Sequence, residues 1–128
     1  MIEVEVKMKN VMIVDDATFM RMTIKRILEN NDFNVVAEAE NGFKAIELFL
    51  QLKPDIISLD ITMPEMDGIE TLRKIKEIDS KAKVVMVTAM GQDKLVREAV
   101  KLGATSFLVK PFNENQLIQT FKQVSSRN

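Results

Sequence analysis

Five short runs of aliphatic residues, separated by stretches with helical periodicity, limit what this chain can fold into more than any other feature. The runs lie at residues 11–14, 35–37, 56–59, 84–87 and 107–109. Each run is apolar at successive positions rather than at alternate ones, which is typical of strands in a sheet that is covered on both faces. The runs therefore predict five buried strands.

The segments between and after these runs carry apolar residues at the spacing of amphipathic helices. The five stripes are Met20, Ile24, Ile27 and Leu28; Ala45, Leu48, Phe49 and Leu52; Ile69, Leu72, Ile75 and Ile78; Leu95, Ala99 and Leu102; and Leu117, Phe121 and Val124. Strict alternation of strand and helix with short connections implies right-handed crossovers and a parallel sheet. The predicted fold is therefore α/β, a single (βα)5 domain with a doubly wound five-stranded parallel sheet.

The composition excludes most familiar enzyme chemistry. The 128 residues include no His and no Cys, so the chain has no His base, no Cys nucleophile and no zinc site built from these residues. A net charge of −1, with scattered Lys and Arg, does not favour binding to nucleic acid. No apolar segment reaches the ~20 residues that a membrane span needs. We therefore expect a cytoplasmic monomer that binds neither nucleic acid nor a membrane.

Polar side chains follow four of the five predicted strands. Asp15 and Asp16 follow the first strand, Asp60 the third, Thr88 the fourth and Lys110 the fifth. Each of them alone is more often a cap, a turn residue or a solvated side chain, but in open α/β sheets the carboxyl ends of the strands form the ligand site. Three carboxylates at one edge repel one another. A divalent cation such as Mg²⁺, or the ammonium group of Lys110, would relieve this repulsion.

The chain contains four ordered motifs, Ile-Val-Asp15-Asp16, Asp60-Ile-Thr-Met-Pro64-Glu-Met-Asp-Gly68, Thr88-Ala89 and Lys110-Pro111-Phe112. Together they resemble the receiver domain of two-component response regulators, over residues 8–124. Residues 15–21 and the chain end soon after the last helix are most similar to stand-alone chemotaxis regulators of the CheY type. The resemblance implies the flavodoxin-like strand order 2-1-3-4-5, a cis Lys110–Pro111 bond, a receiver domain at residues 8–128 and an N-terminal extension of unknown role at residues 1–7.

The resemblance also implies a phosphoacceptor function that depends on Mg²⁺. Asp60 would be the nucleophile that takes a phosphoryl group from a phosphohistidine of a CheA-like histidine kinase. The carboxylates of Asp16 and Asp60 and the backbone carbonyl of Thr62 would bind Mg²⁺, and Asp15 would act through water. The protein would be a signalling switch rather than an enzyme, with self-phosphorylation from phosphodonors and slow self-dephosphorylation.

The same resemblance implies how the signal is read out. Lys110 and the hydroxyl group of Thr88 would contact the phosphoryl oxygens, and the movement of Thr88 would make room for Phe107. The expected partner surface is formed by the last two helices and the last strand, with exposed side chains at Val96, Val100, Phe107 and Val109. The favoured target is a flagellar motor switch protein.

Three alternatives stay open at this stage. The first is a phosphorelay intermediate that passes the phosphoryl group to a histidine phosphotransfer protein. A phosphatase of the haloacid dehalogenase type would need a second Asp two residues after Asp60, where Thr62 stands. An FMN-binding carrier would need neutral phosphate donors in the first loop, where Asp15 and Asp16 would repel the phosphate.

Two positions depart from the pattern of many receivers, which carry Asn or charged residues there. Thr62 stands two residues after Asp60, and Met90 stands two residues after Thr88. Both positions flank the route of the water molecule that hydrolyses an aspartyl phosphate. Because neither side chain has an amide or a charge, we expect slow hydrolysis and a separate phosphatase partner.

Overall fold

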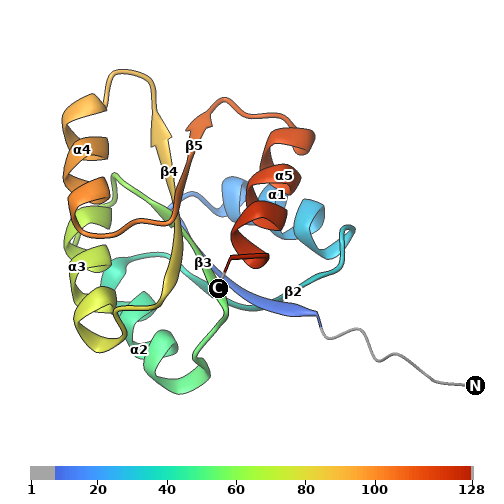
Figure 1. Ribbon diagram of the computed structural model, residues 1–128, viewed down its shortest axis with the longest axis horizontal. Helices are drawn as coiled ribbons and strands as arrows, with labels where there is room; N and C mark the ends of the chain where they lie inside the picture. The colour runs from blue at the N-terminus through green and yellow to red at the C-terminus, as the bar shows by residue number, and fades with distance from the viewer. Residues whose placement is uncertain (1–7, 128) are drawn as a thin grey trace, which may run out of the picture.

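The computed structural model describes residues 8–127, in which strands and helices alternate without exception (Figure 1). The elements are β1 (Lys9–Val14), α1 (Thr18–Glu29), β2 (Phe33–Ala39), α2 (Gly42–Leu52), β3 (Ile56–Asp60), α3 (Gly68–Ile78), β4 (Lys83–Ala89), α4 (Asp93–Lys101), β5 (Ser106–Lys110) and α5 (Glu114–Ser125). The expected extension at residues 1–7, and residue 128, lie outside the described part of the chain. Among the described residues, no helix is both long enough and apolar enough to cross a membrane.

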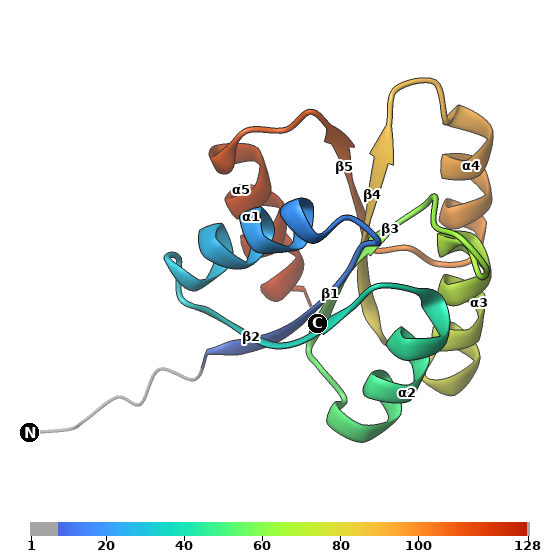
Figure 2. The same cartoon turned by 180° about the vertical axis from the view of Figure 1, so that it is seen from behind.

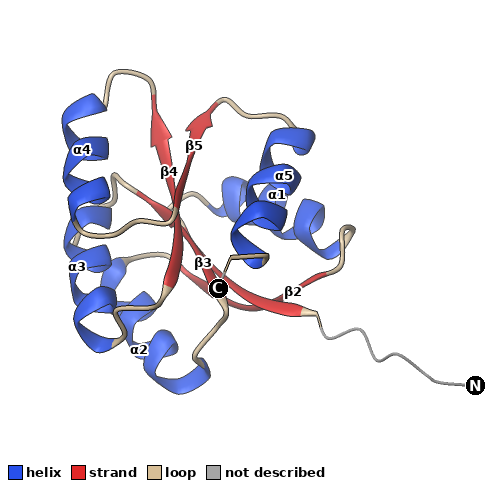
Figure 3. Cartoon of the chain, viewed as in Figure 1, coloured by secondary structure: helices blue, strands red, loops and turns tan. Residues whose placement is uncertain are grey.

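All five strands are parallel and form one sheet with the order β2-β1-β3-β4-β5 (Figure 3). The predicted (βα)5 fold and its strand order are confirmed. The Lys110–Pro111 peptide bond is cis, as the resemblance implied. The central strand β3 is buried at every position.

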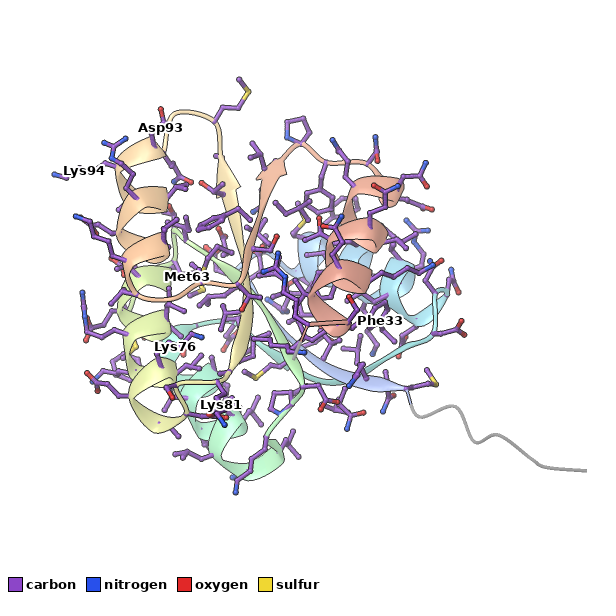
Figure 4. All side chains as sticks on the ribbon, in the orientation of Figure 1. Phe33, Met63, Lys76, Lys81, Asp93 and Lys94 are labelled. Carbon is purple, nitrogen blue, oxygen red and sulfur yellow. The ribbon has the colours of Figure 1, made fainter. Side chains whose placement is uncertain are left out.

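The helices form a layer on each face of the sheet, with α1 and α5 on one face and α2, α3 and α4 on the other (Figures 1 and 2). Successive strand residues point to opposite faces, so Ile57 packs under α2 and α3 while its neighbour Ile56 packs under α1 and α5. Phe33, which is labelled in Figure 4, meets Phe121 edge to face on the second of these faces, with ring centroids 5.8 Å apart. Burial on both faces explains why the strands are apolar at every position.

Every strand extends beyond its predicted run, β2 by the most residues, and two helical stripes are shorter than predicted. Strand β2 begins at Phe33 and ends at Ala39, beyond the predicted 35–37, because it lies at the edge of the sheet and includes the exposed residues Asn34 and Glu38. Leu52 and Ile78, which were expected to complete two apolar stripes, are 45% and 44% exposed at the last residues of α2 and α3. The helical stripes are therefore shorter than predicted.

Candidate functional site

The register of the two central strands brings the acidic residues together. Val14, the last residue of β1, pairs with Leu59 of β3, so the next residues lie side by side: Asp15, directly after β1, and Asp60, the last residue of β3. One carboxylate oxygen each from Asp15, Asp16 and Asp60 lies within 4.8 Å of the other two. Asp15 and Asp60 are only 1% and 8% exposed, whereas Asp16 is open to solvent. The predicted acidic cluster therefore exists, and most of it is desolvated.

Lys110 reaches this cluster from the end of β5. Lys110 pairs with Ala89, the last residue of β4. The Nζ of Lys110 lies 3.3 Å from Asp15 Oδ2 and 3.5 Å from Asp60 Oδ2. A single ammonium group thus faces three carboxylates, of which two are buried. The cluster keeps excess negative charge when all of these groups are ionised, which favours the binding of a cation.

The carboxylate of Asp15 is held by the chain that follows it. Its Oδ1 accepts a hydrogen bond from the backbone N–H of Ala17 at 2.8 Å. Its backbone carbonyl accepts one from Arg21 Nη1 at 2.6 Å, and Arg21 also pairs with Glu38 at 3.4 Å. Arg21 therefore fixes the loop between β1 and α1.

A glycine sets the position of Asp60. The backbone N–H of Gly68, the first residue of α3, donates to the carbonyl of Ile61 at 2.7 Å. A Cβ atom at Gly68 would overlap the backbone carbonyl oxygen of Asp60, so only glycine lets the start of α3 pack against the end of β3. Asp67 caps α3 by accepting from the N–H of Glu70 at 2.9 Å, which makes it a structural residue.

Burial raises the pKa of the Asp60 carboxyl above its ordinary value of 3.8, and the negative charge of Asp15 raises it further. The Lys110 ammonium and the backbone N–H of Thr62 oppose this rise in pKa. Because burial outweighs the favourable contacts, the ionised form of Asp60 is costly in the protein without a bound cation. This ionised form is the one that a nucleophile requires.

The pKa of Asp60 predicts how stability changes with pH. A carboxyl with a higher pKa in the folded chain than in the unfolded chain holds more protons when folded, so folding is weakened as pH rises from about 4 through that pKa. We expect Asp60→Asn to be more stable than the wild type near pH 7 when both proteins are measured in EDTA. Denaturant melts from pH 4 to 8 should show the difference growing with pH. A constant difference, or a less stable variant at pH 7, would contradict this reading of Asp60.

Thr88, the residue before the end of β4, contacts a residue that the sequence interpretation missed. Thr88 is buried, with 2% of its surface exposed. Its hydroxyl oxygen lies 2.7 Å from Gln92 Oε1. Gln92 Nε2 in turn lies 2.7 Å from the hydroxyl oxygen of Thr62. The available signal was a long amide side chain four residues after Thr88, directly before α4. One polar residue in a loop has no periodicity that would single it out.

The expected partner surface is only partly exposed. Val100 and Val109 are 57% and 48% exposed, as expected. Phe107 and Val96 are half-buried and pack against the core beneath α2, α3 and α4, which corrects the expectation that both are free on the surface. Phe107 lies two residues before Val109 on β5, so both point to the α4 side of the sheet.

The fold and this site together have the arrangement of a receiver domain: paired acidic residues, a central Asp, a Thr and a Lys at the carboxyl edge of a (βα)5 sheet. The family model described as response regulator receiver domain matches residues 11–122. The chain belongs to the response regulator receiver family.

Several relatives have names from chemotaxis. The chain is 50% identical over 113 residues to chemotaxis protein CheY of Bacillus subtilis (strain 168), covering 88% of this chain and 94% of that protein. It is 48% identical over 117 residues to chemotaxis protein CheY of Thermotoga maritima, covering 91% and 98%. The crystal structure of chemotaxis protein CheY4 from Vibrio cholerae superposes with a TM-score of 0.86 at 28% identity, covering 92% and 99%. These likenesses define a receiver domain of the CheY type.

Proposed function

We propose that this protein is a phosphoacceptor switch in which Asp60 takes a phosphoryl group from a phosphohistidine of a sensor kinase. The observation that carries the proposal is the position of Asp60, which is buried at the carboxyl end of β3, beside Asp15 and 3.5 Å from Lys110 Nζ. Burial raises the free energy of the ionised Asp60 carboxylate. A reaction in which this carboxylate forms a covalent bond, and so loses its charge, is therefore favoured.

In the transfer step, one carboxylate oxygen of Asp60 attacks the phosphorus atom opposite the histidine nitrogen. The phosphorus–nitrogen bond breaks, its electron pair returns to the imidazole ring, and an acyl phosphate forms on Asp60. Lys110 Nζ, 3.5 Å from Asp60 Oδ2, is within reach of an oxygen of the new phosphoryl group. The Thr88 hydroxyl would donate to a second oxygen.

The donor set fits a hard divalent cation such as Mg²⁺. Asp15, Asp16 and Asp60 offer three carboxylate oxygens within 4.8 Å of one another, and the excess negative charge of the cluster calls for a positive partner. Asp16 and Asp60, with the backbone carbonyl of Thr62, are the proposed direct ligands, and Asp15 is proposed to act through water. When bound, Mg²⁺ would neutralise charge on the phosphoryl oxygens.

The test of the phosphoacceptor proposal is uptake of phosphate from a small donor. Purified protein incubated with acetyl phosphate and Mg²⁺ should gain the mass of one phosphoryl group, and EDTA should prevent the gain. Uptake that is equally fast in EDTA would contradict the metal-dependent mechanism, and no uptake under any condition would contradict the phosphoacceptor function.

The exposed carboxylate of Asp16 provides a separate prediction. Asp16→Ala should weaken Mg²⁺ binding about tenfold or more and slow phosphorylation, because one direct ligand is lost. The variant should be as stable as the wild type in EDTA, or more stable, because one of three mutually repelling carboxylates is gone. Mg²⁺ titration and thermal melts in EDTA measure the two effects. A clear loss of stability in EDTA would show that Asp16 is chiefly a structural residue.

The proposed output is binding of the phosphorylated protein to a flagellar motor switch protein, in the cytoplasm. The chemotaxis names of the relatives support this target, and Val100 and Val109 offer exposed apolar side chains on the proposed surface. The alternative is a relay in which Asp60 passes its phosphoryl group to a histidine phosphotransfer protein. Affinity capture from lysate with the beryllofluoride-loaded protein should enrich a motor switch protein. Enrichment of a histidine phosphotransfer protein instead would favour the relay.

A further inference from the structure

Gln92 connects two loops at the phosphoacceptor site through three hydrogen bonds. Its Oε1 lies 2.7 Å from both the Thr88 hydroxyl and the backbone nitrogen of Ala89, and its Nε2 lies 2.7 Å from Thr62 Oγ1. Gln92, in the loop after β4, therefore joins the end of that strand to the loop after β3, which begins at Ile61. Asp93, the next residue, begins α4 at the edge of the sheet where β4 and β5 end (Figure 4).

The neighbours of Gln92 fix which way its amide points. The backbone N–H of Ala89 can only donate, so the atom that faces it must be the amide oxygen. The Thr88 hydroxyl faces the same oxygen and must therefore donate to it. On the other side, the Nε2 group donates to the hydroxyl oxygen of Thr62.

This arrangement commits the single hydroxyl proton of Thr88. A hydroxyl has one proton, and here it lies on the 2.7 Å bond to Gln92, in preference to the longer 3.2 Å contact with the carbonyl of Ala89. Thr88 cannot donate to a phosphoryl oxygen on Asp60 while this bond lasts. The side chain of Gln92 also leaves the first turn of α4 without a side-chain cap, although Gln92 occupies the capping position.

We propose that Gln92 is a positioning residue that holds the Thr88 hydroxyl away from Asp60 in the unphosphorylated protein and so opposes the switch to the active state. This inference rests on the proposed function, in which Thr88 donates to the phosphoryl group. Phosphorylation must break the hydrogen bond between Thr88 and Gln92. The free energy of this bond therefore opposes the change to the active state. Removing the amide should make the active state easier to reach.

The test compares beryllofluoride binding by the wild type and by Gln92→Met, which keeps the length of the side chain but removes its amide. The protein has no Trp, so backbone amide resonances of Ala89 and Gly91 provide the readout. At saturating Mg²⁺, the half-saturating beryllofluoride concentration should fall about fivefold in Gln92→Met, which corresponds to the loss of one opposing hydrogen bond of ~1 kcal/mol. Without beryllofluoride, the same resonances should shift toward their positions in the loaded wild type.

Two further variants separate this role from a merely structural one. In a Thr88→Ala background, Gln92→Met should change the half-saturating concentration less than twofold, because no hydroxyl is left to hold. Gln51→Met, the same substitution at an exposed position near the end of α2, should have no effect.

An unchanged or higher half-saturating concentration in folded Gln92→Met would overturn the role of Gln92 but not the proposed function. The same would follow if Gln92→Met lowered this concentration equally in the Thr88→Ala background. If Gln92→Met does not fold, Thr62→Val, which removes the other end of the bridge, should shift binding in the same direction, and no shift would again overturn it. A wild type that does not respond to beryllofluoride would overturn the proposed function itself.

Discussion

Replacing Lys110 by Met should slow phosphorylation by acetyl phosphate at least about a hundredfold at saturating Mg²⁺. Lys110 Nζ lies 3.3 Å from Asp15 and 3.5 Å from Asp60, so it is the cationic side chain in place to stabilise charge on the transferring group. Removing one preorganised donor of this kind costs about a hundredfold to a thousandfold in rate. The initial rate of the mass increase measures the effect.

The matched control is Lys81→Met. This substitution removes the same charge from an exposed lysine between α3 and β4, at the opposite edge of the sheet (Figure 4). We expect its rate to equal that of the wild type. A rate for Lys110→Met within threefold of the control would mean that Lys110 only pairs the carboxylates and does not act on the phosphoryl group.

The lifetime of the phosphorylated protein should be long, and Thr62 and Met90 should set it. Hydrolysis needs a water molecule held in line with the phosphorus atom. Met90 is 81% exposed and offers only a thioether, and the hydroxyl oxygen of Thr62 already accepts from Gln92. Thr62→Asn with Met90→Glu supplies two polar groups that can hold this water, so decay should be about tenfold faster, the effect of ~1.4 kcal/mol.

Release of inorganic phosphate at saturating Mg²⁺ measures this decay. Met22→Glu, which changes a second exposed methionine on α1, is the control and should decay as the wild type does. If the double variant decays no faster than this control, the two side chains do not set the lifetime, and the expected need for a separate phosphatase loses its basis.

The central part of the fold and the acidic cluster could be predicted because one physical constraint produces both. Strands buried on two faces must be apolar at every position, so their ends are visible in the sequence where charge first occurs. In a parallel sheet those ends share one edge, which places Asp15 beside Asp60 and brings Lys110 within 3.5 Å of both. No knowledge of the loops was needed for this part of the site.

The features that were missed depend on the loops or on partial exposure. Strand β2 is longer than predicted because an edge strand includes polar residues such as Asn34 and Glu38. Gln92 reaches Thr88 and Thr62 only through the path of the loop before α4, which no spacing in the sequence encodes. Phe107 is partly buried against the core on the α4 side of the sheet. Its alternating position on the strand predicts the face to which it points but not how much of its side chain is exposed.

The central claim is that Asp60 is the phosphoacceptor, and the most direct test is the intact mass of three proteins after incubation with acetyl phosphate and Mg²⁺. The wild type should gain one phosphoryl group. Asp60→Asn should gain none, whereas Asp67→Asn, a change to the residue that caps α3, should gain one. Undiminished labelling of Asp60→Asn would contradict the account, because the phosphoryl group would then reside on another residue.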